Sequence, residues 1–247
     1  MDNNDLQTER NQEKHPEDNT LFGTTAAKDT LRQGLEDMFY LLSRDYPPKA
    51  SLALVGNRYN LIKRQLLALQ GMSCSSQQFQ QRKNKELLPE ALKNKTIYID
   101  GFNLLILLET VHSGGFVFKG LDGCYRDISS VHGTYKMMNQ TGEVLVSIGD
   151  VLRRLEVEKV IWIFDAPISN SGKLKSFCYE LAEKHQFSWE IYLENSPDKF
   201  LIGGDKIVCS SDAWILDECA AWFNLGAWII HNEKDRRLNI VDCQLQL

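Results

Sequence analysis

Residues 95–109 read KTIYIDGFNLLILLE, two apolar runs separated by a carboxylate and a glycine. The first run, Thr96–Ile99, is short and rich in β-branched residues, which is typical of a strand buried on both faces of a sheet. The second run, Asn103–Val111, is long enough for a helix. We therefore expect a central strand that delivers Asp100 to one edge of a sheet. Gly101 would allow a turn there and the close approach of a ligand.

The same alternation of short apolar runs with helical segments continues toward the C-terminus. Further strands are predicted at Val160–Phe164, Trp189–Leu193, Ile207–Cys209 and Ala227–Ile230, and further helices at Gly142–Leu155, Gly172–Lys184 and Ala213–Phe223. This pattern indicates an α/β fold, with a parallel sheet covered by helices on both faces. Right-handed crossovers would bring the carboxyl ends of the strands to one edge, which is where ligands bind in open α/β sheets.

The first 93 residues lack this alternation and are predicted to form two parts. Residues 1–20 carry six acids and two bases without apolar periodicity, so we expect a disordered acidic tail. Residues 21–93 are predicted to form a small all-α module, and residues 94–247 the α/β domain. Helices of the module are expected at Ala26–Leu42, Lys49–Val55, Leu61–Leu69 and Leu87–Leu92. The polar stretch 73–85 is predicted to be a linker or an exposed loop.

Composition and charge restrict the class of protein. The chain has 247 residues, is 43% hydrophobic and lacks an apolar run long enough to span a bilayer, so we expect a cytoplasmic globular protein without a membrane partner. Its six cysteines form no CxxC pair, which favours free thiols over a zinc site. Residues 21–95 carry a net charge of +6 and residues 96–247 a net charge of −7, so the first part is the better candidate for binding a polyanion.

Three of the predicted strands end in, or are closely followed by, an aspartate. Asp100 ends the first, Asp165 follows Val160–Phe164, and Asp212 follows the segment KIVCSS. Carboxylates gathered at one edge repel one another unless a cation lies between them, and hard oxygen ligands suit Mg²⁺ or Mn²⁺. We therefore expect a divalent metal site, although Asp212 could instead cap the helix that starts at Ala213.

Other polar residues are candidates for the same edge. Asp122 and Asp127 flank Arg126, either as further metal ligands or as a turn with a local ion pair. Glu109 lies two helical turns beyond Asn103 and points either to this edge or to solvent. Four residues at the start of a predicted helix could bind a phosphate or simply cap the helix: Ser169, Ser171, Lys173 and Lys175.

Three segments of the sequence resemble the PIN-like superfamily, including its NYN branch. They are IYIDGFNLL (97–105), WIFDAPISNSG (162–172) and VCSSDAWILDECAAWFNLGAWII (208–230). From about Ala26 onward the chain also resembles a poorly characterised prokaryotic family. That family joins a small helical module, with a stretch like YPPKASLALVGNRYNL (46–61), to a PIN-like domain.

The resemblance implies an RNA-cleaving site that holds Mg²⁺ or Mn²⁺. Motif by motif, it gives metal-ligand roles to Asp100, Asp165 and Asp212, and a supporting role to Asn103. We also expect supporting roles for Arg126 and for Ser211 of the Ser-Ser-Asp turn. PIN nucleases usually supply a fourth acid from the middle of the domain, for which the candidates here are Asp127, Asp122 and Glu143. We choose Asp127, because it belongs to the motif Gly123-Cys-Tyr-Arg126-Asp127, which is among the parts that resemble the prokaryotic family.

The sequence therefore predicts a metal-dependent ribonuclease, in which the metal ion activates a water molecule. Its helical module would hold RNA through Arg58, Lys63 and Arg64. We also expect either a homodimer or a ribonucleoprotein partner. Two other functions stay open: a non-catalytic RNA-binding or scaffold protein with a degenerate PIN-like site, and a phosphohydrolase acting on a nucleotide or another small phosphoester.

Overall fold

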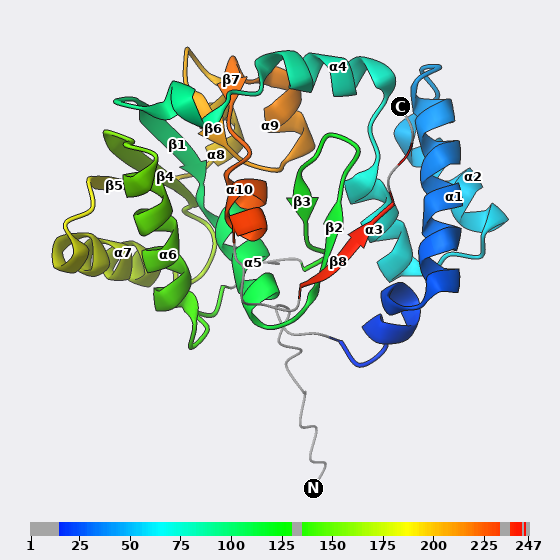
Figure 1. Cartoon of the computed structure of the whole chain (residues 1–247), viewed down its shortest axis with the longest axis horizontal. Coiled ribbons are helices and arrows are strands. Elements are labelled where there is room, and N and C mark those ends of the chain that lie inside the picture. The colour runs from blue at the N-terminus through cyan, green and yellow to red at the C-terminus, as the bar shows by residue number, and fades with distance from the viewer. Residues whose placement is uncertain (1–14, 130–134, 233–237, 244, 246–247) are drawn as a thin grey trace, which may run out of the picture.

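The computed structural model describes residues 15–129, 135–232, 238–243 and 245, so most of the predicted acidic tail lies outside the described residues. Its main feature is a five-stranded parallel sheet with the strand order β5-β4-β1-β6-β7 (Figure 1). The strands are β1 (Thr96–Asp100), β4 (Lys159–Asp165), β5 (Trp189–Glu194), β6 (Ile207–Cys209) and β7 (Ala221–Trp222). The predicted α/β fold class, with a parallel sheet flanked by helices, is confirmed.

Helices cover both faces of this sheet. One face packs through residues such as Ile97, Ile99 and Trp162 against α5 (Gly101–His112), α6 (Thr141–Arg154), α7 (Ser171–His185) and α10 (Leu225–Asn232). The other face packs through Ile161 and Ile163 against α8 (Pro197–Ile202) and α9 (Ala213–Glu218). Because neighbouring residues of β4 point to opposite, equally covered faces, its sequence is apolar without interruption.

The N-terminal part is helical, as predicted. It contains a π-helix at Asn19–Gly23, α1 (Thr25–Leu42), α2 (Pro48–Arg58), α3 (Lys63–Met72), α4 (Ser76–Lys85) and a 3₁₀ turn at Pro89–Leu92. Residues 15–20 form a turn and the start of the π-helix instead of the disorder that we expected there.

The core of these helices includes strands from the rest of the chain. Phe116 and Phe118 of β2 (Phe116–Lys119) and Val241 of β8 (Asn239–Asp242) are buried with Phe22 and Leu35. β2 pairs with β3 (Tyr125–Arg126) and, in parallel, with β8. Figure 1 shows this small sheet between the N-terminal helices and the main sheet. The helical part therefore completes its core with later strands.

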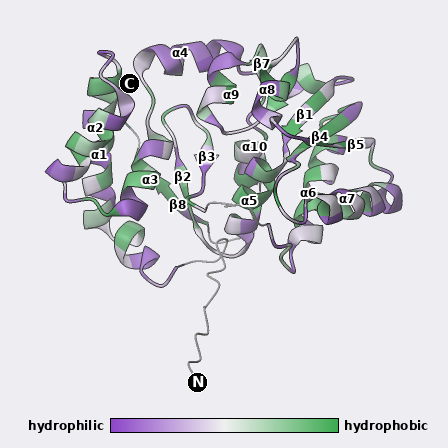
Figure 2. Cartoon of the chain, turned by 180° about the vertical axis from the view of Figure 1, so that it is seen from behind, coloured by the Kyte–Doolittle hydropathy of each residue, from purple (hydrophilic) through white to green (hydrophobic). Residues whose placement is uncertain are grey.

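The segment 73–85, predicted to be a linker, is mostly the helix α4. Ser75 caps it in a reciprocal arrangement, because its hydroxyl accepts from the backbone N–H of Gln78 while the Gln78 side chain accepts from the backbone N–H of Ser75. The helix is mostly hydrophilic (Figure 2), and its buried residue is Arg82. The prediction of a linker or loop was therefore wrong. The helix was missed because it packs through a charged side chain and so shows no apolar periodicity in its sequence.

Two further predictions near the C-terminus were also wrong in detail. Ala227–Ile230 belongs to the helix α10 and is not a strand. Asn224 precedes this helix and caps it by accepting from the backbone N–H of Ala227. The helix predicted at Ala213–Phe223 ends at Glu218, and the chain then enters the short strand β7. A short apolar run does not distinguish a buried helix from a strand.

Gly101 is required for a reason other than the expected turn. It is the first residue of α5, and a β-carbon there would overlap the ring of Phe164 and lie 2.9 Å from the carbonyl oxygen of Ile163. The space next to Gly101 is therefore filled by β4 and is not open to a ligand. In addition, none of the helices in the described part of the chain is long and apolar enough to cross a membrane.

Candidate functional site

Four aspartates are placed at the carboxyl edge of the five-stranded sheet. Asp100 ends β1, Asp165 ends β4, and Asp212 follows β6. The fourth, Asp198, lies in the first turn of α8 just after β5. The chain crosses from β5 to β6 over the central β1, so the topological switch point lies between β1 and β6. This is the place where open α/β sheets bind ligands.

The four carboxylates influence one another electrostatically. Burial, together with the charges of Asp212, Asp198 and Asp165, raises the pKa of Asp100 to about 7. Burial and the charge of Asp198 raise the pKa of Asp165. Burial and the charge of Asp212 raise the pKa of Asp198. The group therefore favours either bound protons or a nearby cation at neutral pH.

Hydrogen bonds fix the turn from Ser210 to Asp212 against β1 and α5. The Ser210 hydroxyl donates to Oδ2 of Asp100 at 2.7 Å and accepts from the backbone N–H of Asp212 at 3.0 Å. The backbone N–H and the hydroxyl of Ser211 both donate to Oδ1 of Asn103 at 2.9 Å. Asn103 thus supports the turn through Ser211.

Asp212 caps α9, which was the alternative to metal binding. Its Oδ1 accepts from the backbone N–H groups of Trp214 at 2.8 Å and of Ile215 at 3.1 Å. This capping bond is compatible with a place in the acidic group, because the charge of Asp212 still raises the pKa values of Asp100 and Asp198. The capping role is therefore present, and a metal-binding role stays a prediction.

The donor chemistry of this edge suits Mg²⁺ or Mn²⁺, since carboxylate and hydroxyl oxygens are the ligands that hard divalent cations prefer. The geometry is more restrictive. Within residues 15–129, 135–232 and 238–243, no group of three or more His, Cys, Asp or Glu side chains could hold a metal ion. Mg²⁺ commonly uses only one or two protein carboxylates and completes its shell with water and substrate phosphate. An ion held by a pair of these carboxylates therefore stays a prediction.

Asp122 and Arg126 belong to a different group, which contains two arginines. Asp122 accepts from Arg126 at 2.7 and 2.9 Å and from Nη1 of Arg82 at 2.6 Å. Burial would raise the pKa of Asp122, but the charges of Arg126 and Arg82 and their hydrogen bonds lower it below its usual value. Of the two alternatives for Asp122, the structure shows the local ion pair with Arg126.

Asp127 and Glu109 also lie in surroundings different from those of the strand-end aspartates. Oδ1 of Asp127 accepts from the backbone N–H of Ser129 at 2.6 Å, and burial raises its pKa to about 6. Glu109 is fully buried and accepts from the hydroxyls of Tyr135 and Thr141, while burial raises its pKa to about 7. Burial and local hydrogen bonds account for both pKa shifts, without a contribution from the four strand-end aspartates. Glu109 therefore points neither to solvent nor to the acidic group.

The predicted phosphate site lies at the start of α7, directly after β4. Ser171 is buried, and its hydroxyl donates to the carbonyl oxygen of Ala166 at 3.3 Å. Ser169 and Lys173 are exposed at this end of the helix, and Lys175 is half-buried. Ser171 thus stabilises the loop, and Ser169 and Lys173 are the members of the predicted set with exposed side chains.

The three basic residues of the helical part differ in their availability. Arg64 makes two hydrogen bonds of 2.9 Å to the buried Asp18. Arg58 is exposed and lies 3.5 Å from Asp37, and Lys63 is exposed. Arg64 is therefore committed to an internal ion pair, which weakens its predicted role in RNA binding.

Sequence reasoning missed two features of the site. Asp198 follows Ser196-Pro197, and proline in the first turn with an acid behind it is a helix-start signal that could have revealed α8. Trp214 is 45% exposed, although tryptophan is usually buried, and it lies two residues after Asp212. Nothing in the sequence alone distinguishes Trp214 from the buried tryptophans of the chain.

Comparison with protein families gives a match over most of this sheet. The family described as Domain of unknown function (DUF5616) matches residues 89–228, more than half of the chain. The chain belongs to the DUF5616 family. The DUF5616 match contains all four strand-end aspartates, so the acidic edge is part of the family's domain. A second family, described as Protein of unknown function (DUF434), matches residues 30–85, from α1 to α4.

A relative extends this comparison to most of the chain. The Uncharacterized protein MJ0935 of Methanocaldococcus jannaschii is 29% identical over 187 residues, which cover 76% of this chain and 89% of the relative. No solved structure matches the chain. The expected pairing of an N-terminal helical segment with an α/β domain thus coincides with the DUF434 and DUF5616 matches. Neither family description mentions the PIN-like superfamily, so the PIN-like assignment stays a prediction.

Proposed function

We propose that this protein is a PIN-like, divalent-cation-dependent hydrolase of RNA phosphodiester bonds. The observation that carries the proposal is the placement of Asp100, Asp165 and Asp212 at the carboxyl edge of a parallel sheet, beside its switch point. Burial and three neighbouring carboxylates also raise the pKa of Asp100 to about 7. Groups with strongly shifted pKa values at such a place are typical of functional sites. The strand-end positions of Asp100, Asp165 and Asp212 also agree with the motifs of the PIN-like resemblance.

In this proposal, the protein supplies the ligands and the orientation of the site. Asp100 and one neighbouring aspartate would hold Mg²⁺ or Mn²⁺, and Ser210 would keep the Asp100 carboxylate ionised and oriented through its 2.7 Å bond. The cation would lower the pKa of a bound water molecule and stabilise charge that develops on the phosphate. Lys173 and Ser169, exposed at the start of α7, would contact the phosphate backbone.

The experiment compares the wild-type protein with Asp100→Asn and Asp165→Asn. We would measure cleavage of structured and single-stranded RNA with Mn²⁺, and Mn²⁺ binding by calorimetry. Each substitution should reduce cleavage by at least about 100-fold, because even outer-shell partners of metal sites contribute 10- to 100-fold. Asp205→Asn is a matched control, since Asp205 is exposed in the loop before β6. Equal cleavage by the wild type and both site variants would refute the proposal.

The two other functions give different results in the same assays. A non-catalytic RNA-binding or scaffold protein is favoured by the absence of a three-carboxylate metal group in the described residues. It would bind RNA but show neither Mn²⁺ binding at millimolar concentration nor cleavage. A phosphohydrolase of small substrates would bind Mn²⁺ and hydrolyse a nucleotide or a chromogenic phosphoester, leaving RNA intact.

A further inference from the structure

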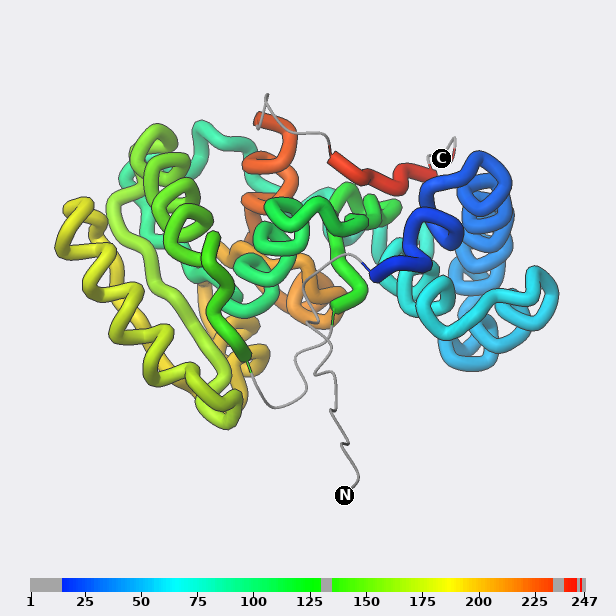
Figure 3. Tube along the Cα trace, turned by 90° about the horizontal axis from the view of Figure 1, so that it is seen from below, coloured from blue at the N-terminus to red at the C-terminus, as the bar shows by residue number. Residues whose placement is uncertain are grey.

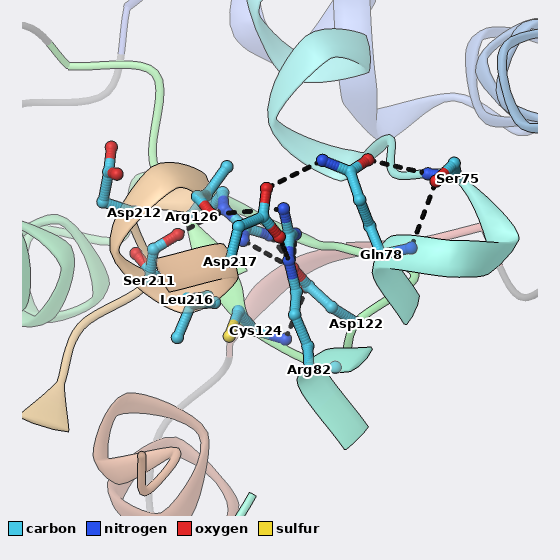
Figure 4. Close-up of polar contacts among 12 residues, drawn as sticks. Ser75, Gln78, Arg82, Asp122, Cys124, Arg126, Ser211, Asp212, Leu216 and Asp217 are labelled. Carbon is cyan, nitrogen blue, oxygen red and sulfur yellow. Dashed lines mark hydrogen bonds and ion pairs between the residues drawn. The ribbon is translucent and has the colours of Figure 1, made fainter. Parts of the chain in front are cut away.

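A buried group of charged side chains connects the N-terminal helices to the acidic edge of the sheet. Arg82 of α4, which is 1% exposed, donates from Nη1 to Asp122 at 2.6 Å and from Nε to Asp217 of α9 at 2.7 Å. Arg126 of β3 donates to the same Asp122 through both of its terminal nitrogens. Figure 4 shows the two guanidinium groups converging on Asp122, with Asp217 beside them. We name Arg82, Asp122, Arg126 and Asp217 the arginine clamp.

The arginine clamp is attached directly to the turn that carries the site residues. The Nε of Arg126 donates to the carbonyl oxygen of Ser211 at 2.7 Å, and Ser211 bonds on its other side to Asn103. Nη2 of Arg82 donates to the carbonyl oxygen of Ala213 at 3.3 Å. The clamp therefore contacts the backbone on both sides of Asp212, whose own side chain points away from it (Figure 4).

The same clamp fixes α9 as a whole. Besides Arg82, Gln78 donates to the Asp217 carboxylate at 2.8 Å, and Lys85 donates to the Asp217 carbonyl oxygen at 2.8 Å. The chain after α4 continues this attachment, because the backbone N–H of Leu87 donates to the carbonyl oxygen of Trp222 in β7. One side of α4 is thus hydrogen-bonded to α9, the helix that Asp212 caps.

Burial of this many charges is not explained by stability alone. Replacing a buried ion pair with apolar residues of similar volume is often neutral or stabilising, and in some proteins buried polar groups instead specify one arrangement of the elements. In the arginine clamp each guanidinium satisfies several donors with Asp122, Asp217 and the backbone, so the relative placement of α4, β3 and α9 is strongly specified.

We propose that Arg126 and Arg82 are positioning residues of the candidate site. They hold the Ser210–Asp212 turn so that Ser210 and Asp212 face Asp100. Arg82 lies within the DUF434 match and its partners within the DUF5616 match, so the N-terminal segment is an integral part of the site. The effect on metal binding rests on the proposed function, whereas the effect on the turn does not.

The test uses the full chain with Arg126→Lys and, as a milder variant, Asp217→Asn. Lysine carries one compact ammonium group and cannot reproduce the planar contacts of Arg126 to Asp122 and Ser211. Asp217 is partly exposed, and asparagine can still accept from Arg82, so we expect this variant to retain the fold. The matched control is Asp18→Asn, which weakens the buried two-bond pair with Arg64 and leaves every member of the arginine clamp unchanged.

Hydrogen–deuterium exchange of residues 209–216 and Mn²⁺ calorimetry are measured for each variant, together with the thermal midpoint. Arg126→Lys should accelerate exchange in this segment by at least tenfold and weaken Mn²⁺ binding by about 10- to 100-fold. Asp217→Asn should act in the same segment to a smaller extent. Asp18→Asn should lower the midpoint with no change in either measurement.

Unchanged exchange of residues 209–216 in Arg126→Lys and Asp217→Asn would overturn the inference. The same holds if Asp18→Asn accelerates exchange there equally, because the clamp would then contribute only general stability. If wild-type protein neither binds Mn²⁺ nor cleaves RNA while the exchange result is as expected, the proposed function fails and the positioning of the turn stands.

Discussion

The hydroxyl of Ser210 donates a 2.7 Å hydrogen bond to Oδ2 of Asp100 and so joins the carboxyl ends of β6 and β1. This bond acts against the other influences on Asp100. Burial and three neighbouring carboxylates raise the pKa of Asp100 to about 7, while the hydrogen bond from Ser210 lowers it. Ser210 therefore increases the fraction of Asp100 that is ionised near neutral pH.

Ser210→Ala should shift Mn²⁺ binding to higher pH. Without the hydroxyl the pKa of Asp100 rises further, and a cation must then displace a proton from a larger fraction of the molecules. We expect weaker Mn²⁺ binding than wild type at pH 7 and recovery of most of the difference at pH 8.5, measured by calorimetry across this range. Ser176→Ala, on the exposed side of α7, is the control and should follow the wild-type profile. An equal loss of Mn²⁺ affinity at every pH would contradict this explanation.

Asp198→Asn should raise the thermal midpoint of the metal-free protein and reduce the further rise that Mn²⁺ causes. The charge of Asp198 raises the pKa values of Asp100 and Asp165, so its removal relieves repulsion. We expect the thermal midpoint at pH 8 without metal to rise by about 1–3 °C, as for a gain of under about 1 kcal/mol. The additional rise caused by millimolar Mn²⁺ should become smaller, because the site has lost negative charge.

The control for this prediction is Asp205→Asn, which neutralises an exposed acid close to α8 in the sequence. It should change neither midpoint appreciably. If Asp198→Asn gains as much from Mn²⁺ as the wild type does, Asp198 does not contribute to cation binding, and the acid that completes the site lies elsewhere.

The contrast between Asp198 and Asp100 shows what the sequence could predict. Thr96–Ile99 and Val160–Phe164 are continuous apolar runs, so their strands, and the aspartates at their ends, were predicted to within one or two residues. Asp198 was missed because it belongs to a six-residue helix, which is too short to show periodicity. Which acids share an edge also depends on strand order, and that is a property of the whole sheet.

The arginine clamp was missed for a related reason. The sequence of α4 is hydrophilic, and its buried face consists of an arginine whose partners lie at Asp122 and Asp217. Local propensity describes neither a helix that packs through ion pairs nor the completion of the N-terminal core by β2 and β8. Figure 3 shows β8, in red, lying beside the blue N-terminal helices, although almost the whole chain separates them in sequence.

Glu109 should make the stability of the protein depend on pH. Its folded-state pKa is about 7, above the usual value of 4.5, so the folded protein retains the proton more tightly than the unfolded chain does. The resulting stabilisation is fully present below about pH 4.5 and is lost as the pH rises through 7. Glu109→Gln removes this titration, so the fall of the unfolding free energy over that range should become shallower by up to about 1.4 kcal/mol per pH unit.

Urea unfolding at pH 5, 6, 7 and 8 measures this effect. Glu143→Gln is the matched control, because Glu143 is exposed in the first turn of α6, and it should retain the wild-type slope. Among the described residues, Oε2 of Glu109 has no hydrogen-bond partner, so the amide of glutamine will lower the absolute stability. An unchanged slope in Glu109→Gln would show that another group, such as Asp100 or Asp127, causes the pH dependence.

Trp214 should bind an unpaired base if the protein acts on single-stranded RNA. Its side chain is 45% exposed on the first turn of α9, and its backbone N–H is bonded to Asp212. Stacking of a base on an aromatic side chain contributes about 1–3 kcal/mol, so Trp214→Ala should weaken binding of a short single-stranded RNA by about 5- to 150-fold. Trp214→Phe retains a ring and should lose much less.

Tryptophan fluorescence measures this binding directly, with EDTA present to prevent cleavage. Trp162 and Trp222 are fully buried and Trp189 nearly so, which makes Trp214 the residue whose emission a stacked base should quench. The half-buried Trp228 is the control, and Trp228→Phe should retain both the affinity and the quenching. If Trp214→Ala binds RNA as tightly as the wild type, or is quenched as strongly, the RNA does not stack at this position and its bases lie elsewhere on the surface.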